Sequence, residues 1–369
     1  MNIDEFYMKV NELLPFKSDK ELHFRKRMRH ALSIYKVLLN DFVKELPVER
    51  ETLLKDVEFI IEKINKMVEN CMAGRTSTGY AQLANLLRTI ERGNRIIPKI
   101  DIKKTILQFD SNVNFYRIRI LNSIIDVPRK EMFHIPLDMR GIIKTQRYSI
   151  PGYPCLYLGY SIYGCWEEMH QPPTHTCAVS RFTNTIPLNF IDLTIPSKED
   201  FKNPEYLKLL PLIIASMIQV AETDATYKPE YIVPQLLMEW VLKNREYMDN
   251  GNKTTIHGIA YTSTRKHDGF DFPNHVFINY AIPVFSVGMD RKYCKKLCEY
   301  FKLTLPTTNE IEKLKQGFDL DSGRFGLNEE EQREQNYRLS DFGNLEKRLT
   351  NEQQFPSYSI DYKGKDVIP

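Results

Sequence analysis

The sequence contains no run of about 18 apolar residues, the length that a membrane-spanning helix requires. Its first residues, Met1–Phe16, carry acidic side chains where a secretory signal peptide carries basic ones. Six cysteines are present, and none lies in a CxxC pair or at zinc-ribbon spacing. From these absences we expect a soluble, cytoplasmic protein whose cysteines are reduced core residues, without a bound metal.

The chain also lacks a strong charge of either sign. Its 369 residues include 51 Lys and Arg against 48 Asp and Glu, a formal net charge of +3. Such a small excess gains little from neutralising phosphates, so a dedicated nucleic-acid-binding protein is not indicated. Hydrophobic residues make up 42% and charged residues 27% of the chain, which is usual for globular proteins and excludes general disorder.

Apolar residues recur every three or four positions through residues 1–98, which is the period of amphipathic helices. The breaks between these periodic segments are polar or contain glycine. The pattern predicts a small antiparallel helical bundle in this part of the chain. Its helices are predicted over Ile3–Leu14, Asp19–Leu46, Val48–Cys71 and Gly79–Arg92.

Beyond Pro98, β-branched and aromatic residues alternate in a way that favours strands, as in Asn114–Ile120 and His275–Tyr280. Two apolar helices are predicted among these strands, over Pro204–Glu222 and Glu230–Asn244. Since strands and helices do not alternate regularly, the sequence favours an α+β domain.

These differences predict three segments. A helical N-terminal domain covers residues 1–98, and a mixed α+β domain covers residues 99–305. Residues 306–369 are polar, and we expect a helical appendage or a partly ordered tail there.

The densest group of unusual residues lies between Phe133 and His170. A loop rich in Pro and Gly leads into an apolar stretch over residues 155–159, which predicts a short buried strand. A helix is predicted directly after it, with Ser161 as its N-cap. His170 and His175 flank a Pro-Pro turn, but without a third ligand at suitable spacing we interpret them as loop histidines.

The predicted helix after Ser161 carries two adjacent acids. Its apolar face consists of Ile162, Trp166 and Met169. Glu168 lies at the edge of that face, from which a carboxylate can reach a cleft. Glu167 points away from the face and is expected to be solvated, and both acids could also be ordinary surface residues.

Two further groups offer polar side chains. Alternation along the strand Asn114–Ile120 puts Arg117 and Arg119 on the same face, which is either an anion-binding platform or a solvent-facing charged strand. Ser263 ends a β-rich stretch, where clefts often open. No GxSxG elbow surrounds it, so it is not interpreted as a hydrolase nucleophile.

Four of these pieces resemble the RES-domain family, which is named for its arginine, glutamate and serine. They stand in the family's order and cover roughly residues 112–285. The pieces are Tyr116-Arg117, the block Arg147-Tyr148 to Gly152-x-Pro154-x-Leu156-Tyr157, Ser161 followed seven residues later by Glu168, and Gly258-Ile259-x-Tyr261-x-Ser263.

The resemblance implies a fold similar to that of ADP-ribosyltransferases, with NAD as the substrate and cleavage of the bond between nicotinamide and ribose. Arg117, Glu168 and Ser263 are then the catalytic residues. Glu168 stabilises an oxocarbenium-like ribose, Arg117 holds a diphosphate or ribose oxygen, and Ser263 orients the substrate by hydrogen bonding. The NAD-binding residues implied are Arg117, Arg119, Arg147, Tyr148, Tyr157 and Glu167.

The choice between the two adjacent glutamates stays open. The spacing from Ser161 favours Glu168, and Glu167 is the alternative. Where the family often has an aromatic residue followed by asparagine, this chain has Tyr148-Ser149.

The acceptor of the ADP-ribose is also open. Water gives an NAD glycohydrolase, inorganic phosphate gives an NAD phosphorylase, and a protein side chain gives an ADP-ribosyltransferase. Such an enzyme is expected to act as a bacterial toxin or phage-defence effector. Because it would harm its own cell, we expect restraint by an antitoxin, by the N-terminal bundle, by the polar tail or by homo-oligomerisation.

A second hypothesis comes from Arg25 and His30, which have the arginine–histidine spacing of the RNA-cleaving HEPN proteins. The pattern is short, and we prefer to interpret it as a basic solvated helix face or an interaction surface.

Overall fold

The computed structural model describes residues 1–17, 22–45, 49–87, 100–121, 127–173, 176–249, 252–265, 272–285, 292–307 and 329–368. The chain forms two compact units. Unit 1 comprises Met1–Leu107, Thr145–Ile150 and Phe190–Ile259, and unit 2 comprises Gln108–Lys144, Pro151–Asn189 and Ala260–Pro369. Three of the five boundaries between the units fall within the strands β1 (Ile106–Phe109), β5 (Leu188–Leu193) and β8 (Gly258–Thr262).

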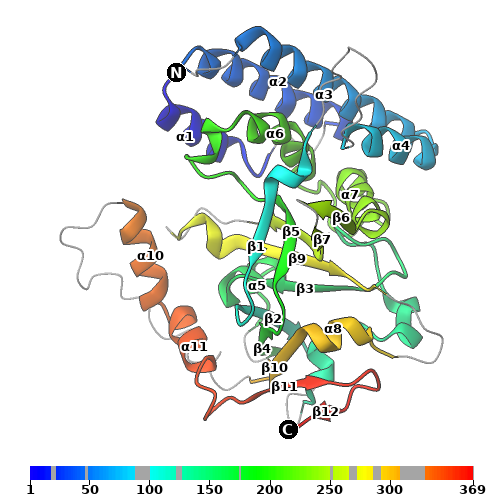
Figure 1. Cartoon of the computed structure of the whole chain (residues 1–369), viewed down its shortest axis with the longest axis vertical. Coiled ribbons are helices and arrows are strands. Elements are labelled where there is room, and N and C mark those ends of the chain that lie inside the picture. Colours follow the sequence, from blue (N-terminus) through cyan, green and yellow to red (C-terminus); the bar gives the residue numbers. More distant parts are fainter. Residues whose placement is uncertain are drawn as a thin grey trace. The chain divides into compact units, whose positions relative to one another are not determined.

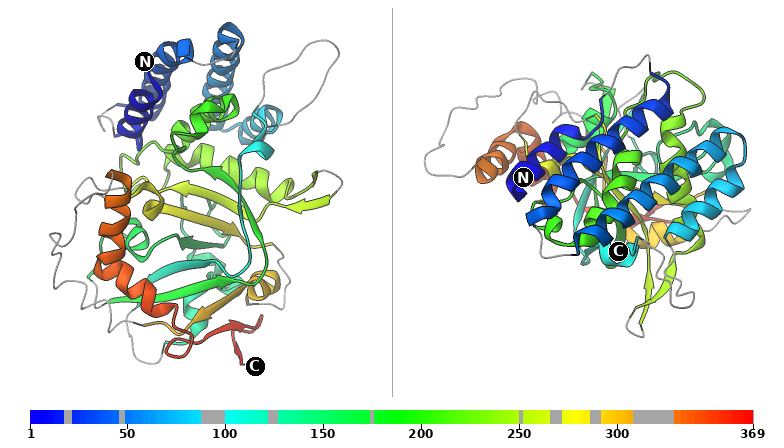
Figure 2. Two further views of the ribbon diagram at one scale, coloured as in Figure 1. Left: turned by 60° about the vertical axis from the view of Figure 1, so that its left-hand side comes forward. Right: turned by 90° about the horizontal axis from the view of Figure 1, so that it is seen from above.

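Unit 1 is mainly helical, and α2, α3 and α6 pack against one another in it (Figures 1 and 2). Its helices are α1 (Ile3–Leu13), α2 (Phe24–Phe42), α3 (Arg50–Met72), α4 (Thr76–Leu86), α6 (Pro204–Ser216) and α7 (Ile232–Lys243). Short 3-10 turns lie at η1 (Val43–Glu45), η2 (Ile102–Thr105), η6 (Asp200–Lys202) and η7 (Pro229–Tyr231), and a hairpin at β6 (Glu246–Asp249) and β7 (Asn252–Thr255).

Aromatic rings and one buried ion pair hold unit 1 together. Phe6 stacks on Phe42 with ring centroids 4.2 Å apart, and Phe201 meets Phe6 edge-on at 5.0 Å. Arg27 and Glu230 form an ion pair in which both side chains are buried. Removing either partner would leave an uncompensated buried charge.

Unit 2 is built on antiparallel strands that follow one another in the sheet as β9, β3, β2, β4, β10, β11 and β12. Their bounds are β2 (Asn114–Ile120), β3 (Cys155–Gly159), β4 (Cys177–Asn184), β9 (Ile278–Pro283), β10 (Phe301–Thr304), β11 (Ser357–Ile360) and β12 (Asp366–Val367). The helices are α5 (Ile162–Glu168), α8 (Lys295–Tyr300), α10 (Glu329–Leu339) and α11 (Asp341–Leu349), with 3-10 turns at η3 (Arg129–Met132), η4 (Leu137–Ile142) and η8 (Asn274–Phe277).

The C-terminal segment is an integral part of unit 2. Helices α10 and α11, drawn in orange, follow one another and lead into the last two strands (Figure 2). α11 packs on α5, where Phe342 meets Tyr163 edge-on at 5.1 Å. Arg129, which is buried, pairs with Asp366 at 2.5 Å. The described part of the segment predicted as an appendage or partly ordered tail, residues 329–368, therefore contributes to the core of the unit.

The α+β class predicted from the sequence is confirmed, with N-terminal helices followed by a strand-rich part. The strand Asn114–Ile120 and the strand over residues 155–159 have the predicted bounds. The predicted helix ends at Asp19, Leu46, Val48 and Arg92 lie outside the described residues.

Several predicted bounds were wrong, among them the start of the helix predicted from Gly79, which begins at Thr76. The helix that begins at Pro204 ends at Ser216 rather than Glu222, because the backbone of Ile218 forms a bridge with Phe16. The strand predicted from His275 begins at Ile278, because the preceding residues form a 3-10 turn after Pro273.

The division into compact units differs from the three predicted segments. Helices α6 and α7, which we assigned to the α+β domain, pack with the N-terminal helices in unit 1. The helical period predicts an apolar face but does not specify the partner that covers it. The domain boundaries, in the sense of independently folding parts, stay a prediction.

All six cysteines are free and buried, as predicted for core residues. Among the helices that the structure describes, none combines the length and the apolar character needed to cross a membrane.

Candidate functional site

Helix α5 is fixed firmly at its N-terminal end. Ser161 is the N-cap, as predicted, and its Oγ accepts a hydrogen bond from Gly164 N at 2.8 Å. The same hydroxyl donates to the carbonyl of Val276 at 2.6 Å. A side chain at position 164 would lie 2.4 Å from that carbonyl, so the close approach requires glycine.

The body of α5 lies close against β3 and β2. A Cβ at Gly159 would lie 2.4 Å from the sulfur of Cys165, so only glycine allows this approach. Cys165 in turn donates to the carbonyl of Tyr116 on β2 at 3.3 Å. These contacts position the last residue of the helix, Glu168, beside the strands.

The structure brings together two of the three predicted catalytic residues. Ser263 follows directly after β8, is fully buried, and donates from Oγ to Oε2 of Glu168. Asn279 on β9 donates to the same oxygen at 3.4 Å. No described residue makes a hydrogen bond to Oε1, so one oxygen of the carboxylate is anchored and the other remains available.

Asn279 was missed by the sequence analysis. Its register partner on β3 is Gly159, and the side chain therefore has room to reach Glu168 past a residue without a Cβ. No local pattern distinguishes this asparagine, since its partner lies 111 residues away in the sequence.

The expectation that Glu167 is solvated was wrong. It is buried rather than solvated, with an exposed fraction of 2%. It accepts hydrogen bonds from the hydroxyl of Tyr163 and from Nε2 of Gln171, the latter at 2.9 Å. Burial, and after it the bond to Glu167, raises the pKa of Tyr163. Both donors act on Oε1 of Glu167, and the side chain differs from that of Glu168, which is half-buried, in being almost fully enclosed.

Arg117 lies half-buried on β2 and has spare hydrogen-bonding capacity. Its Nη1 donates to the carbonyl of Tyr157 at 2.6 Å, whereas its buried Nε has no hydrogen-bond partner among the described residues. Burial, and after it the charge of Arg119, lowers the pKa of Arg117 to about 10. Within the described residues no hydrogen bond or ion pair joins Arg117 to Glu168.

The face of β2 that carries Arg117 is covered by polar neighbours. Arg119 donates to the carbonyl of Glu131 and lies 3.9 Å from its carboxylate. His134 is buried and accepts from Cys294 N at 3.0 Å. Burial lowers the pKa of His134 to about 4, so its imidazole is neutral at neutral pH. Arg117 and Arg119 are therefore both partly enclosed.

Two of the predicted NAD-binding residues belong to unit 1. Arg147 is buried and donates to the carbonyls of Ser216 at 2.8 Å and Ile218 at 3.3 Å. Its guanidinium also lies over the ring of Tyr231 at 5.1 Å. Tyr148 is buried as well. The role in NAD binding stays a prediction for both.

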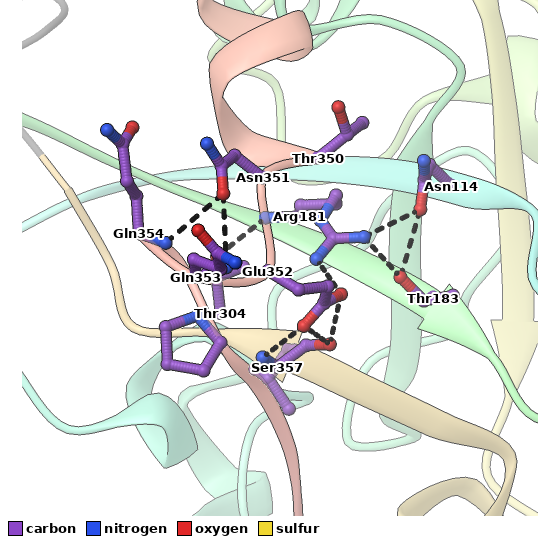
Figure 3. Close-up of polar contacts among 12 residues, drawn as sticks. Asn114, Arg181, Thr183, Thr304, Thr350, Asn351, Glu352, Gln353, Gln354 and Ser357 are labelled. Atoms are coloured by element: carbon purple, nitrogen blue, oxygen red, sulfur yellow. Dashed lines mark hydrogen bonds and ion pairs between the residues drawn. The ribbon is translucent and has the colours of Figure 1, made fainter.

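A polar cluster around Arg181 was also missed by the sequence analysis (Figure 3). Arg181 on β4 is buried and pairs with Glu352, which lies 171 residues further along the chain. Its Nη1 donates to Asn114 and Thr183, both at 3.1 Å. Glu352 also accepts from Ser357 N at 3.1 Å, so the cluster ties the C-terminal segment to the sheet.

A second carboxylate from the C-terminal segment reaches α5. Oε1 of Glu346 on α11 accepts from Ile162 N, at the start of α5, at 2.7 Å. It also accepts from the hydroxyl of Tyr337 at 2.5 Å. Burial raises the pKa of Glu346 to about 7, although both hydrogen bonds oppose the shift. Glu346 therefore caps the end of α5 opposite to Glu168.

The alternative pair, Arg25 and His30, lies on α2. Arg25 is 3.8 Å from Glu69 and 45% exposed, and the ring of His30 meets Phe16 edge-on at 5.9 Å. His175 lies outside the described residues.

The chain was compared with families, with curated proteins and with solved structures. No family model matches it, and no solved structure matches it. It is 31% identical over 278 residues to a protein of Bacillus subtilis (strain 168) named "Putative toxin YopC". The match covers 69% of this chain and 59% of that protein, so the chain spans about three fifths of the length of the relative it matches. Membership of the RES-domain family and likeness to the ADP-ribosyltransferase fold stay predictions.

Proposed function

We propose that this chain cleaves NAD between nicotinamide and ribose, with Glu168 as the catalytic carboxylate. The observation that carries the proposal is that this carboxylate is half-buried and held through one oxygen, whereas the neighbouring Glu167 is buried. Ser263 and Asn279 both donate to Oε2, which fixes the carboxylate, and Oε1 has no partner among the described residues. A carboxylate held in this way can stabilise a developing positive charge without reorganising.

The chemistry requires little else. Nicotinamide leaves as a neutral ring from a cationic one, so no general acid is needed. The barrier lies in an oxocarbenium-like ribose, the kind of transition state found in glycoside hydrolysis. Glu168 is assigned the stabilisation of that charge. Ser263 is assigned the orientation of Glu168, in addition to the orientation of the substrate implied by the resemblance.

Arg117 is assigned to a diphosphate or ribose oxygen of NAD. Its Nε has no hydrogen-bond partner in the described parts of the chain, and a charge-assisted bond to an anionic oxygen would satisfy it. Arg119 on the same strand face is the alternative cation. Tyr157, whose carbonyl orients Arg117, is assigned to packing on the nicotinamide ring.

The acceptor is water or inorganic phosphate in this proposal, giving an NAD glycohydrolase or phosphorylase. A protein acceptor, giving an ADP-ribosyltransferase, is the alternative. The carboxylate and the arginine serve all three, because the acceptor enters only after the nicotinamide bond is weakened.

We further propose that the chain acts as a toxin or a phage-defence effector. The name of its Bacillus subtilis relative supports a toxin role. An enzyme that consumes NAD depletes its own cell, so the proposal includes a protein partner or self-association that restrains it.

The test is to incubate the full chain with NAD and with total RNA, and to identify products by mass spectrometry with and without phosphate. We expect free nicotinamide and intact RNA. The Glu168→Ala variant should release no nicotinamide, and the His30→Ala variant should release as much as the parent. RNA fragments that disappear in His30→Ala, with no nicotinamide from the parent, would contradict the proposal.

A further inference from the structure

The turn after α5 holds two non-glycine residues in the left-handed backbone region. His170 has a φ of 64° and Gln171 a φ of 51°. His170 N donates to the carbonyl of Glu167 and Gln171 N to that of Trp166, both at 3.0 Å, which is the pattern of a Schellman turn. Glycine is the usual residue in such a turn because any Cβ is unfavourable there. The chain therefore keeps these two side chains at a cost in backbone energy.

The side chain of Gln171 has a structural explanation, since it donates to the buried Glu167. The side chain of His170 reaches a different partner. Its Nδ1 accepts a hydrogen bond from Nη1 of Arg265 at 2.6 Å. The backbone N–H of Arg265 donates to Oγ of Ser263 at 3.1 Å. The contact between His170 and Arg265 thus lies next to the contact between Glu168 and Ser263.

Arg265 has no carboxylate within ion-pair distance in the part of the chain that the structure describes. The imidazole accepts one of the five N–H donors of its guanidinium. A half-buried arginine held by a neutral acceptor keeps its charge and most of its donors for another group. The planar fork of arginine matches the oxygens of phosphate.

A purely structural explanation is that Arg265 stabilises the C-terminal end of α5 through the helix dipole. That explanation accounts for the cation but not for His170, because glycine at this position would form the same turn without strain. A residue retained against the backbone preference points to a use for its side chain.

We propose that Arg265, oriented by His170, forms a phosphate-binding subsite beside Glu168. The inference rests on the proposed function for the place of this phosphate next to the ribose. Two sources supply the same chemistry, the diphosphate of NAD and inorganic phosphate as the acceptor.

The test is calorimetric titration of the full chain with ADP-ribose, with inorganic phosphate and with adenosine, which lacks phosphate. The variants are Arg265→Gln, Arg265→Lys and, as a matched control, Arg338→Gln, which removes an arginine that is 74% exposed and paired with Glu334. Arg265→Gln should weaken the binding of a phosphate-bearing probe at least tenfold. Arg265→Lys should weaken it less. Adenosine should bind all variants as it binds the parent, and Arg338→Gln should bind every probe as the parent does.

The two sources give different patterns. Weakened ADP-ribose binding identifies the diphosphate of NAD, whereas weakened binding of inorganic phosphate alone identifies the acceptor. Equal binding of both probes by Arg265→Gln and the parent overturns the proposal, and so does a parent that binds neither probe.

A second variant, His170→Gly, separates binding from stability. It relieves the left-handed strain, so its melting temperature should equal or exceed that of the parent while the phosphate-bearing probe binds several-fold more weakly. Unchanged binding would overturn the role of His170.

Nicotinamide release by the same proteins keeps the two proposals distinguishable. Binding of ADP-ribose that depends on Arg265, without any nicotinamide release, would contradict NAD cleavage and leave the subsite standing. Nicotinamide release with an unchanged KM and unchanged binding in Arg265→Gln would contradict only the subsite.

Discussion

The two ends of helix α5 differ in how completely their polar groups are satisfied. At the N-terminal end, Ser161 and Glu346 take up backbone donors, and both side chains lie in a closed network. At the C-terminal end, Glu168 keeps one oxygen without a protein partner, and Arg265 lacks a carboxylate among the described residues. A short helix fixed at one end and chemically incomplete at the other is suited to presenting reactive groups. The N-terminal end therefore fixes the helix, and the C-terminal end carries the side chains of the proposed site.

The largest expected effect comes from the incomplete end. Glu168→Gln keeps an acceptor for Ser263 and Asn279 but removes the negative charge. We expect nicotinamide release to fall about a hundredfold or more, since electrostatic stabilisation of the transition state is lost. The free energy of unfolding in urea should change by about 1 kcal/mol or less. A large loss of stability in Glu168→Gln, together with retained activity, would show that this end of α5 serves the fold instead of the reaction.

The next largest effect is the dependence of stability on pH that arises from Glu346. Its pKa in the folded chain is about 7, above the ordinary value of 4.5. A raised pKa means that the stabilisation is fully present below pH 4.5 and is lost as the pH rises through 7. The parent should therefore lose about 3 kcal/mol relative to Glu346→Gln between these limits. Urea unfolding at several pH values measures the difference, and parallel pH profiles for the two proteins would contradict it.

Ser161→Ala should have a smaller effect on the same closed end. The substitution removes the N-cap bond to Gly164 and the bond to the Val276 carbonyl, so the loss should be about 1–2 kcal/mol. The matched control is Ser340→Ala, which removes the N-cap of α11. If Ser161→Ala leaves stability unchanged, the N-terminal end is not the fixed end.

The smallest effect is expected at His170. Glycine suits the left-handed backbone there, so His170→Gly should raise the free energy of unfolding by about 0.5–1 kcal/mol at most. The loss of the contact to Arg265 reduces this gain. Thermal unfolding of His170→Gly measures it. A clear loss of stability would show that the histidine serves the fold rather than the site.

Much of α5 and β2 could be predicted from the sequence because local rules govern them. Ser161 is a cap by residue type and position, and the alternation along Asn114–Ile120 gives the strand and its faces directly. The family resemblance named Glu168 and Ser263 as residues of one site, but it did not predict the hydrogen bond between them, and 95 residues separate them in the sequence.

The remaining features depend on long-range packing. Glu167 was expected in solvent because helical periodicity describes one apolar face, whereas α5 carries the ring of Tyr163 on a second face that α11 covers. Glu346 and Glu352 come from a polar segment whose pattern gives no partner for its acids. Arg265 and His170 lie 95 residues apart, and no local sequence pattern indicates the contact between them.

The most direct test of the central claim is the rate of nicotinamide release from NAD by the parent and by Glu168→Gln, with phosphate present and absent. We predict that the parent releases nicotinamide and that Glu168→Gln, equally folded by circular dichroism, releases almost none. A parent that releases no nicotinamide in either condition, or a Glu168→Gln variant as active as the parent, would contradict it.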